Sequence, residues 1–467
     1  MRHIEFTLDQ FAPIALYERL KKEFAGEISF LLESADVSEG DYSLCIMGAR
    51  ERVQYIDGTT LYTDANLQKN YLKQDPFSFL KEYYSRVDSS KYKRYTRDLG
   101  LGFVDGFVGF IGYDMVQVFE PTLQRYMSTL DDTLNTPDLD LILPKLVAVY
   151  SHKTHKVTLI DLTNSKTTEI EKIKKNLLSD YSYTPLKPIK EEINGSFRHT
   201  KEHFFEMIER SQQMIRSGDV FQVLMTNRYT AEIEVDPFSL YRILRTKNPS
   251  PYMFFMEYED FSIVGSSPEV MVRLSEGEIL LRPIAGTRKR GKNRQEDREL
   301  EIDLLDDPKE LAEHLMLIDL GRNDVGRVAK SGTVEVEDMM HIEHYSHVMH
   351  IVSDVVATLR DDLDMFDLFR ATFTAGTMTG APKIRAMELI AEFEGLKRGF
   401  YSGAIGYFGF DGNMDSAITI RTALLTKSSI VLQAGAGIVA DSVPESEYEE
   451  VQNKLGALLS SLEDLRC

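Results

Sequence analysis

The strongest local signal in the chain is a helix start at Asp307, in the segment DPKELAEHLMLIDLGRNDVGR at residues 307–327. Asp307 can accept hydrogen bonds as an N-cap, and Pro308 stands where a missing N–H is tolerated. Leu311, Leu315 and Ile318 follow at a spacing that places them along one helix face. We therefore predict a helix that buries these three side chains, so the chain must fold against that face.

Two carboxylates share a different face of the same helix. Glu310 and Glu313 are three residues apart, and two carboxylates on one side suit a hard divalent cation. Glu310 is also explained without metal, because a glutamate at this position caps the helix and its negative charge interacts favourably with the helix dipole. Glu313 lies one turn deeper, where capping explains nothing. A metal role therefore requires ligands from elsewhere in the chain.

Composition limits the classes of function. The 467 residues could form roughly three average domains. A net charge of -20 argues against a nucleic-acid partner, and it requires a local cationic site or a metal for any anionic substrate. Cys45 and Cys467 suggest no disulfide framework. The first residues, MRHIEFTLDQ, do not resemble a signal peptide, and no apolar stretch reaches the ~18 residues of a membrane span. We expect a cytoplasmic protein with no membrane contact.

A change of composition marks a boundary. Residues 181–200, YSYTPLKPIKEEINGSFRHT, combine prolines, a charge run and Asn-Gly, as exposed connections do. We place an N-terminal region at 1–185 and a second region at 195–462. The pattern alone supports an α+β protein with many strands and long helices.

Three further segments carry candidate functional residues. HIEHYSHVMHIVSDVVATL reads as one strand with His341, His344, His347 and His350. Their spacing could suggest zinc, but on a strand His347 and His350 point to opposite faces and no cysteine lies nearby. We therefore expect a structural or catalytic role, above all for His350 in the apolar run.

The second segment, SAITIRTALL, carries Arg421 inside an apolar run, and a buried arginine requires an anionic partner. In the third, Ser442 and Glu445 resemble a capping box, while Glu447 and Glu450 repeat the carboxylate spacing of the first helix. Glu447 and Glu450 are also explained without metal, as the acidic first turn of a helix. Two such pairs, each at a helix start, favour a shared cation.

Long strings in the second region resemble one known family. PIAGTRKRG, ELAEHLMLIDLGRND, HYSHVMHIVS, AGTMTGAPKIRAMELI and GAGIVADSVPESEYEE resemble the chorismate-utilising enzymes, and among them the large subunits of anthranilate synthases. The resemblance implies two large antiparallel sheets packed face to face and flanked by helices, with the two regions intertwined. It implies conversion of chorismate and ammonia to anthranilate and pyruvate, in tryptophan biosynthesis, with Mg²⁺ as cofactor.

The resemblance also implies roles for individual residues. Glu313 and Glu450 would hold Mg²⁺, with Glu310 and Glu447 beside them. Glu269 matches the general acid, His350 the histidine associated with loss of pyruvate, and Thr377 a further substrate contact. The enolpyruvyl side chain would be held by Tyr401, Arg421, Gly435, Gly437 and Lys454.

Two positions distinguish this chain from relatives with other products. Isochorismate- and salicylate-forming members have a water-activating lysine where this chain has Gln222, and a neutral amide cannot act as that base. Many aminodeoxychorismate synthases have a nucleophilic lysine where this chain has Ala285. Both differences favour ammonia as the nucleophile.

The resemblance further implies a regulator and a partner. Glu33, Ser34, Pro251, Tyr252, Met253 and Gly406 resemble a tryptophan feedback site, although ordinary strand packing also explains most of their apolar atoms. A glutamine amidotransferase subunit would supply ammonia, in a hetero-oligomer such as a heterotetramer. The alternatives are a sister reaction that yields an aminodeoxychorismate or aminodeoxyisochorismate, and a catalytically silent tryptophan sensor.

Overall fold

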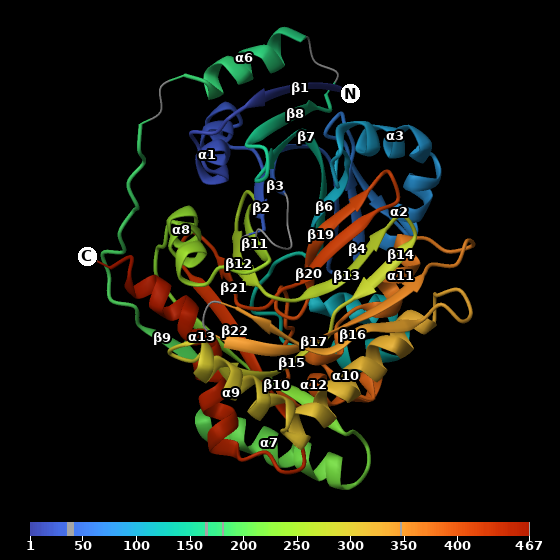
Figure 1. Cartoon of the computed structure of the whole chain (residues 1–467), viewed down its shortest axis with the longest axis vertical. Helices are drawn as coiled ribbons and strands as arrows, with labels where there is room; N and C mark the ends of the chain where they lie inside the picture. Colours follow the sequence, from blue (N-terminus) through green and yellow to red (C-terminus); the bar gives the residue numbers. More distant parts are fainter. Residues whose placement is uncertain (35–41, 164–166, 180–181, 346–347, 467) are drawn as a thin grey trace.

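Antiparallel strands form the centre of the computed structural model, which describes residues 1–34, 42–163, 167–179, 182–345 and 348–466 (Figure 1). In the described residues the strands are β1 Arg2–Thr7, β2 Ser29–Glu33, β3 Tyr42–Ile56, β4 Thr59–Thr63, β5 Lys69–Leu72, β6 Gly106–Ile111, β7 Leu139–Ser151, β8 Lys156–Asp161, β9 Gly195–Phe197, β10 Gln222–Ala231, β11 Tyr252–Glu257, β12 Ser262–Ser267, β13 Val270–Ser275, β14 Glu278–Leu281, β15 Ile284–Lys289, β16 Glu335–His344, β17 Val348–Thr358, β18 Gly380–Ala381, β19 Ala404–Gly409, β20 Met414–Ile418, β21 Thr422–Leu425 and β22 Ile430–Ile438.

Helices flank these strands, which confirms the predicted α+β class. The α-helices are α1 Pro13–Glu23, α2 Pro76–Ser85, α3 Ser89–Leu99, α4 Val116–Phe119, α5 Gln124–Met127, α6 Thr167–Leu177, α7 Lys201–Arg216, α8 Pro237–Lys247, α9 Arg294–Leu305, α10 Pro308–Gly326, α11 Met365–Thr372, α12 Lys383–Glu394 and α13 Pro444–Glu463. Short 3₁₀ turns lie at η1 Tyr113–Met115, η2 Pro121–Leu123 and η3 Gly376–Met378.

The strand pairings form two arms that start from the long β3–β7 pair. One arm runs through β2, β11, β12, β21 and β22 to β10. The other runs through β6, β19, β20, β13 and β14 to β17, which pairs with both β15 and β16. Strands β2 and β6 precede residue 185 and pair with β11 and β19 of the second region, so both arms combine strands from the two regions.

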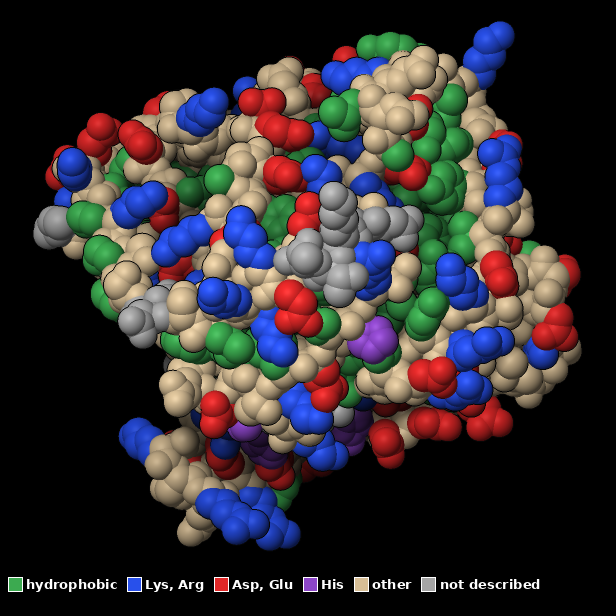
Figure 2. Space-filling model, turned by 90° about the horizontal axis from the view of Figure 1, so that it is seen from above, with side chains coloured by type: hydrophobic (Ala, Val, Ile, Leu, Met, Phe, Trp, Pro, Cys, Tyr) green, Lys and Arg blue, Asp and Glu red, His purple; other side chains and the backbone are tan. Residues whose placement is uncertain are grey.

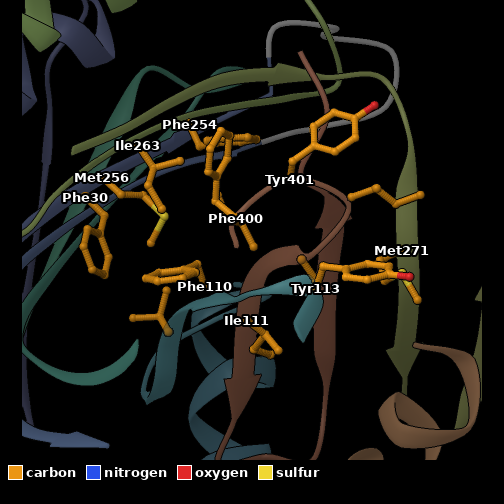
Figure 3. Close-up of a cluster of buried hydrophobic side chains, with 14 of the residues drawn as sticks. Phe30, Phe110, Ile111, Tyr113, Phe254, Met256, Ile263, Met271, Phe400 and Tyr401 are labelled. Carbon is orange, nitrogen blue, oxygen red and sulfur yellow. The ribbon is translucent and has the colours of Figure 1, made fainter. Parts of the chain in front are cut away.

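The core fills the space between the two arms (Figure 3). Apolar side chains from β2, β11 and β12 meet side chains from β6 and β13, among them Phe30, Phe254, Met256, Ile263, Phe110, Ile111 and Met271. Burial of this many apolar side chains between the arms stabilises their relative placement. The outer surface differs, because acidic and basic side chains are interspersed over the face seen in Figure 2.

Helix starts follow the sequence prediction in α10 but not in α13. The Asp307 side chain accepts hydrogen bonds from the amides of Lys309 and Glu310, which confirms it as an N-cap. The predicted capping box at Ser442 and Glu445 does not form, because α13 has Val443 at its N-cap. The Ser442 hydroxyl instead accepts from the amide of Val439 at 3.0 Å, and Glu445 pairs with Lys201.

The buried face of α10 also differs from the prediction. Leu315 is 43% exposed, whereas His314, Leu317 and Ile318 are buried. The helix packs against β15 and β17 through the His314 face, so the stripe through Leu315 faces away from the sheet. In the described residues no helix has the length and apolar character needed to cross a bilayer.

The histidine-rich segment is a hairpin rather than one strand. His341 and His344 lie on β16, and His350 lies on β17, which pairs antiparallel with β16. His347 lies outside the described residues. Within those residues, no group of three or more histidine, cysteine or carboxylate side chains is arranged to hold a metal ion, zinc included.

Candidate active site

The candidate catalytic residues come from the far ends of the two arms. Gln222 lies on β10, Gly435 and Gly437 lie on β22, and Arg421 lies just before β21. The other arm contributes Ala285 on β15, His350 on β17 and Glu269 just before β13. Helices α10 and α13 and the turn η3 cover this region, with β22 packed against α13 and β15 against α10.

Direct contacts connect residues that are far apart in the sequence. The Gln222 Nε2 donates to Glu313 Oε1 at 3.2 Å, and a Cβ on Gly437 would lie 2.3 Å from that same nitrogen. Glycine at 437 therefore leaves the space that the Gln222 amide occupies. Within the described residues the Gln222 Oε1 is buried without a hydrogen-bond partner. An unsatisfied buried acceptor is costly, which favours a role in holding a ligand.

Glu269 is a buried carboxyl with an unusual pKa. Its side chain accepts a hydrogen bond from the Thr377 hydroxyl at 2.9 Å. Burial raises the pKa of Glu269 to about 7, although Thr377, Arg421 and Lys454 act in the opposite direction. The group therefore holds a proton through the acidic range and can donate it near neutral pH.

Arg421 is a buried cation near Glu269 and Tyr345. It lies in the turn between β20 and β21 with φ +50, and not inside a single strand as its sequence context suggests. In the part of the chain that the structure describes, its guanidinium makes no hydrogen bond or ion pair; burial lowers its pKa, and Tyr345 and Glu269 partly offset that effect. The predicted anion is therefore not supplied by these residues, and an anionic ligand fits the position.

Lys454 and Tyr401 lie against β22. The Lys454 ammonium donates to the Gly435 carbonyl at 2.9 Å and pairs with Glu450 at 2.7 Å. Burial raises the pKa of Tyr401, and a hydrogen bond with the Gly435 backbone opposes the rise. The Tyr401 hydroxyl points away from the apolar cluster in Figure 3. Gly435 thus lies between two of the predicted substrate-binding side chains.

His350 contacts residues that sequence reasoning missed. Its Nδ1 lies 2.9 Å from the Gly286 carbonyl and 3.1 Å from the Thr287 hydroxyl. The Tyr345 ring packs edge-on against the imidazole at 5.4 Å between centroids. Burial lowers the pKa of His350, so the ring is neutral at physiological pH. Gly286 and Thr287 directly follow Ala285, and a glycine inside a strand was the one available signal for them.

The two carboxylate pairs lie at helix starts, and basic side chains form ion pairs with one carboxylate of each pair. Glu310 pairs with Arg288 at 3.2 Å, and burial raises its pKa, with Glu313 adding to the rise. Burial likewise raises the pKa of Glu447, and Glu450 adds to it. The charge of Lys309 on α10 lowers the pKa of Glu447 on α13, so the two helix starts are neighbours. A cation would relieve the repulsion within each pair, and carboxylate oxygen is the donor that Mg²⁺ prefers. The donor chemistry suits Mg²⁺, but within the described residues the four carboxylates are not gathered into a metal-binding group.

The candidate tryptophan residues form a different cluster, near the β2–β11 pair. Glu33 faces Met253 across that pair, accepts from the Tyr241 hydroxyl at 2.6 Å and pairs with Arg245 at 2.9 Å. Ser34 directly follows Glu33 at the end of β2.

The remaining members of this cluster lie around Tyr252. Pro251 directly precedes β11, and the Tyr252 hydroxyl donates to Asp415 at 2.9 Å. Gly406 packs against the Asp415 carbonyl, where a Cβ would lie only 2.2 Å away. Tyr252 also pairs with Ser267 of β12, two residues before Glu269, so the cluster is joined to the candidate acid through one strand end.

Known proteins of one family are similar to this chain over most of its length. Residues 39–460 match the chorismate binding enzyme family. The chain is 42% identical over 480 residues to anthranilate synthase component 1 of Aquifex aeolicus (strain VF5), which covers 99% of this chain and 94% of that protein. It is also 42% identical over 477 residues to anthranilate synthase component 1 of Acinetobacter calcoaceticus, which covers 97% of this chain and 93% of that protein.

Solved structures share the fold. The crystal structure of anthranilate synthase component I from Streptococcus pneumoniae TIGR4 matches with a TM-score of 0.78 at 35% identity, over 90% of this chain and 92% of that chain. The menaquinone-specific isochorismate synthase from Escherichia coli matches with a TM-score of 0.71 at 19% identity, over 99% of this chain and 94% of that chain.

Proposed function

Because this chain belongs to the chorismate binding enzyme family, and because relatives named anthranilate synthase component 1 align over nearly its whole length, we propose that it converts chorismate and ammonia into anthranilate and pyruvate. This reaction would be the first step of tryptophan biosynthesis, and the reducing cytoplasm fits the free, buried Cys45 thiol. One observation carries the proposal: Arg421, whose guanidinium has no ion pair among the described residues, acts on Glu269, whose pKa is about 7.

The first chemical step needs an acid and an anchor. Ammonia attacks C2 of the ring while the C4 hydroxyl leaves, so that hydroxyl must take up a proton. Glu269 supplies the proton, and Thr377 holds its carboxyl in place at 2.9 Å. Arg421 binds the carboxylate of the enolpyruvyl side chain, with Lys454, Tyr401 and the backbone at Gly435 and Gly437 around it. The second step releases pyruvate and makes the ring aromatic, with His350 at the reacting edge.

Magnesium is part of the same proposal. Glu313 and Glu450 would hold the ion, with Glu310 and Glu447 supporting them. When bound, Mg²⁺ supplies positive charge to the ring carboxylate. Lys454 and Gln222, which now contact Glu450 and Glu313, keep those carboxylates oriented.

We also propose a partner and a regulator. A glutamine amidotransferase subunit would deliver ammonia, in a hetero-oligomer such as a heterotetramer, and Gln222 and Ala285 favour ammonia over water. Tryptophan would inhibit through Glu33, Ser34, Pro251, Tyr252, Met253 and Gly406. The link from Tyr252 through Ser267 to Glu269 gives such inhibition a short route to the acid.

The test is a product assay. The purified chain is incubated with chorismate, ammonium and Mg²⁺ at mildly alkaline pH, with an EDTA control, and products are separated by chromatography. We expect metal-dependent anthranilate and pyruvate in equal amounts without any added glutaminase. An aminodeoxychorismate or aminodeoxyisochorismate as the sole product would replace the proposal with a sister reaction. Tryptophan binding without turnover would replace it with a silent sensor.

A further inference from the structure

A β-bulge lies directly opposite His350. Strand β15 pairs with β17 so that Ala285 faces Ile351 and Thr287 faces His350, with a register shift between these two pairs. Gly286 is the extra residue, and its φ of +65 is in the left-handed region. A bulge of this kind bends one strand and re-aims the groups beside it, and glycine adopts its conformation without strain.

Space as well as backbone conformation requires glycine here. A Cβ on Gly286 would lie 3.1 Å from methyl carbons of both Ile351 and Leu304. Both side chains belong to the small apolar cluster under β17, where they are buried or packed against one another. A larger residue would therefore push the bulge away from β17, and the Gly286 carbonyl would move with it.

The bulge turns the Gly286 carbonyl toward the imidazole. A carbonyl oxygen can only accept a hydrogen bond, so the Nδ1 atom 2.9 Å away must carry the proton. The Thr287 hydroxyl, at 3.1 Å from the same nitrogen, then accepts as a second partner and keeps its own proton for another acceptor. In the part of the chain that the structure describes, Nε2 has no hydrogen-bond partner.

We propose that the Gly286 bulge holds His350 in the neutral tautomer with the proton on Nδ1, so that Nε2 is a proton acceptor during release of pyruvate. Gly286 and Thr287 are thus positioning residues, and this role rests on the proposed function. Nε2 removes the proton from C2 of the amino intermediate. The electrons of that C–H bond form the C2–C3 double bond, the C3–O bond breaks, and enolpyruvate leaves.

The proton balance closes within the site. The imidazolium carries the C2 proton on Nε2 and retains the Nδ1 proton, which the Gly286 carbonyl continues to accept. Enolpyruvate takes up one proton at its methylene carbon and becomes pyruvate, and loss of the Nε2 proton returns His350 to its starting tautomer. Arg421 keeps the departing carboxylate in place. The opposite tautomer would present an N–H to C2 and could not begin this step.

The direct test is nuclear magnetic resonance of the full chain labelled with ¹⁵N-histidine, with His350→Gln to assign the signals. We expect the His350 Nδ1 to give the shift of a protonated ring nitrogen and Nε2 that of an unprotonated one, at neutral pH. The reverse pattern would overturn the proposal. This result does not depend on turnover, so it stands or fails separately from the proposed function.

Product partition provides the second test. In Thr287→Val we expect anthranilate formation to fall about tenfold, from loss of one hydrogen-bond partner, while chorismate consumption falls less and amino intermediate accumulates. Thr287→Ser keeps the hydroxyl and restores the partition. Gly286→Ala moves the carbonyl and gives a larger accumulation. Equal loss of both steps in Thr287→Val, with no recovery in Thr287→Ser, would show that the bulge is only structural.

Discussion

The candidate active site and the β2–β11 cluster are both rich in buried polar groups, but the buried Glu33 of the cluster has protein partners that Arg421 and Gln222 of the candidate active site lack among the described residues. In the described residues, Arg421 has no ion pair and the Gln222 Oε1 has no hydrogen-bond partner. Glu33, in contrast, binds both Tyr241 and Arg245. Unsatisfied buried groups reduce the free energy of unfolding, so a protein keeps them where a ligand completes them. An anionic ligand therefore fits the candidate active site, whereas a ligand at the cluster must fit beside contacts that already exist.

Removal of the divalent cation should separate the two regions most strongly. With EDTA, anthranilate formation should fall to background, because the four glutamates then repel one another and the ring carboxylate loses its counter-ion. Tryptophan binding, measured by calorimetry, should be unchanged. Glu313→Gln should act like EDTA, and Glu206→Gln on the exposed face of α7 is the control. Turnover that resists EDTA would remove the metal from the proposal.

Two arginine variants should give opposite results. In Arg421→Met we expect kcat/KM for chorismate to fall by about 10³, because roughly two charge-assisted hydrogen bonds to the substrate are lost. The melting temperature should not fall, since no protein ion pair is broken. In Arg245→Met the free energy of unfolding should fall by about 2 kcal/mol, because Glu33 is left buried without its cation, while kcat is retained.

A lowered melting temperature in Arg421→Met with kcat/KM intact would reverse the comparison. It would mean that Arg421 stabilises the fold and that the candidate active site does not bind an anion there. Assays of both variants at saturating ammonium, followed by thermal unfolding, distinguish these outcomes.

The pH profile should report Glu269. This carboxyl must be protonated to act as the acid, so kcat/KM is full below its pKa and falls as the pH rises through about 7. Rates are compared at constant free ammonia. The Thr377 hydroxyl lowers the pKa of Glu269, so Thr377→Val should move this limb to higher pH, while Glu269→Gln should remove it. A limb that stays in place in Thr377→Val would assign it to another group.

The sequence predicts what depends on nearby residues. The N-cap at Asp307, for example, needs only Pro308 and the amides of the first helical turn. Leu315 shows where this reasoning ends, because helical spacing defines a face but not the sheet that covers it. The buried side of α10 is instead set by β15 and β17. The prediction of a capping box at Ser442 is wrong for a similar reason, because Lys201 of another helix forms an ion pair with Glu445.

The site shows the same limit. The resemblance points to Arg421, Glu269 and His350, yet the burial of Arg421 and the pKa of Glu269 depend on strands that come together only in the folded chain. The sequence predicts one strand for the histidine segment, whereas β16 and β17 are separate strands whose antiparallel pairing local spacing does not reveal. The bulge at Gly286 depends on the register of β15 with β17, and local spacing contains no information on that register.

The smallest effect on turnover should come from the cluster. Ser34 follows Glu33 at the end of β2, so a bulky residue there should exclude a ligand without reaching Glu269. In Ser34→Phe we expect the tryptophan concentration for half inhibition to rise by about tenfold, the effect of overfilling a packed site, with kcat unchanged. Ser85→Phe, at the exposed end of α2, is the matched control. Equal loss of inhibition and turnover in Ser34→Phe would count against a separate regulatory site.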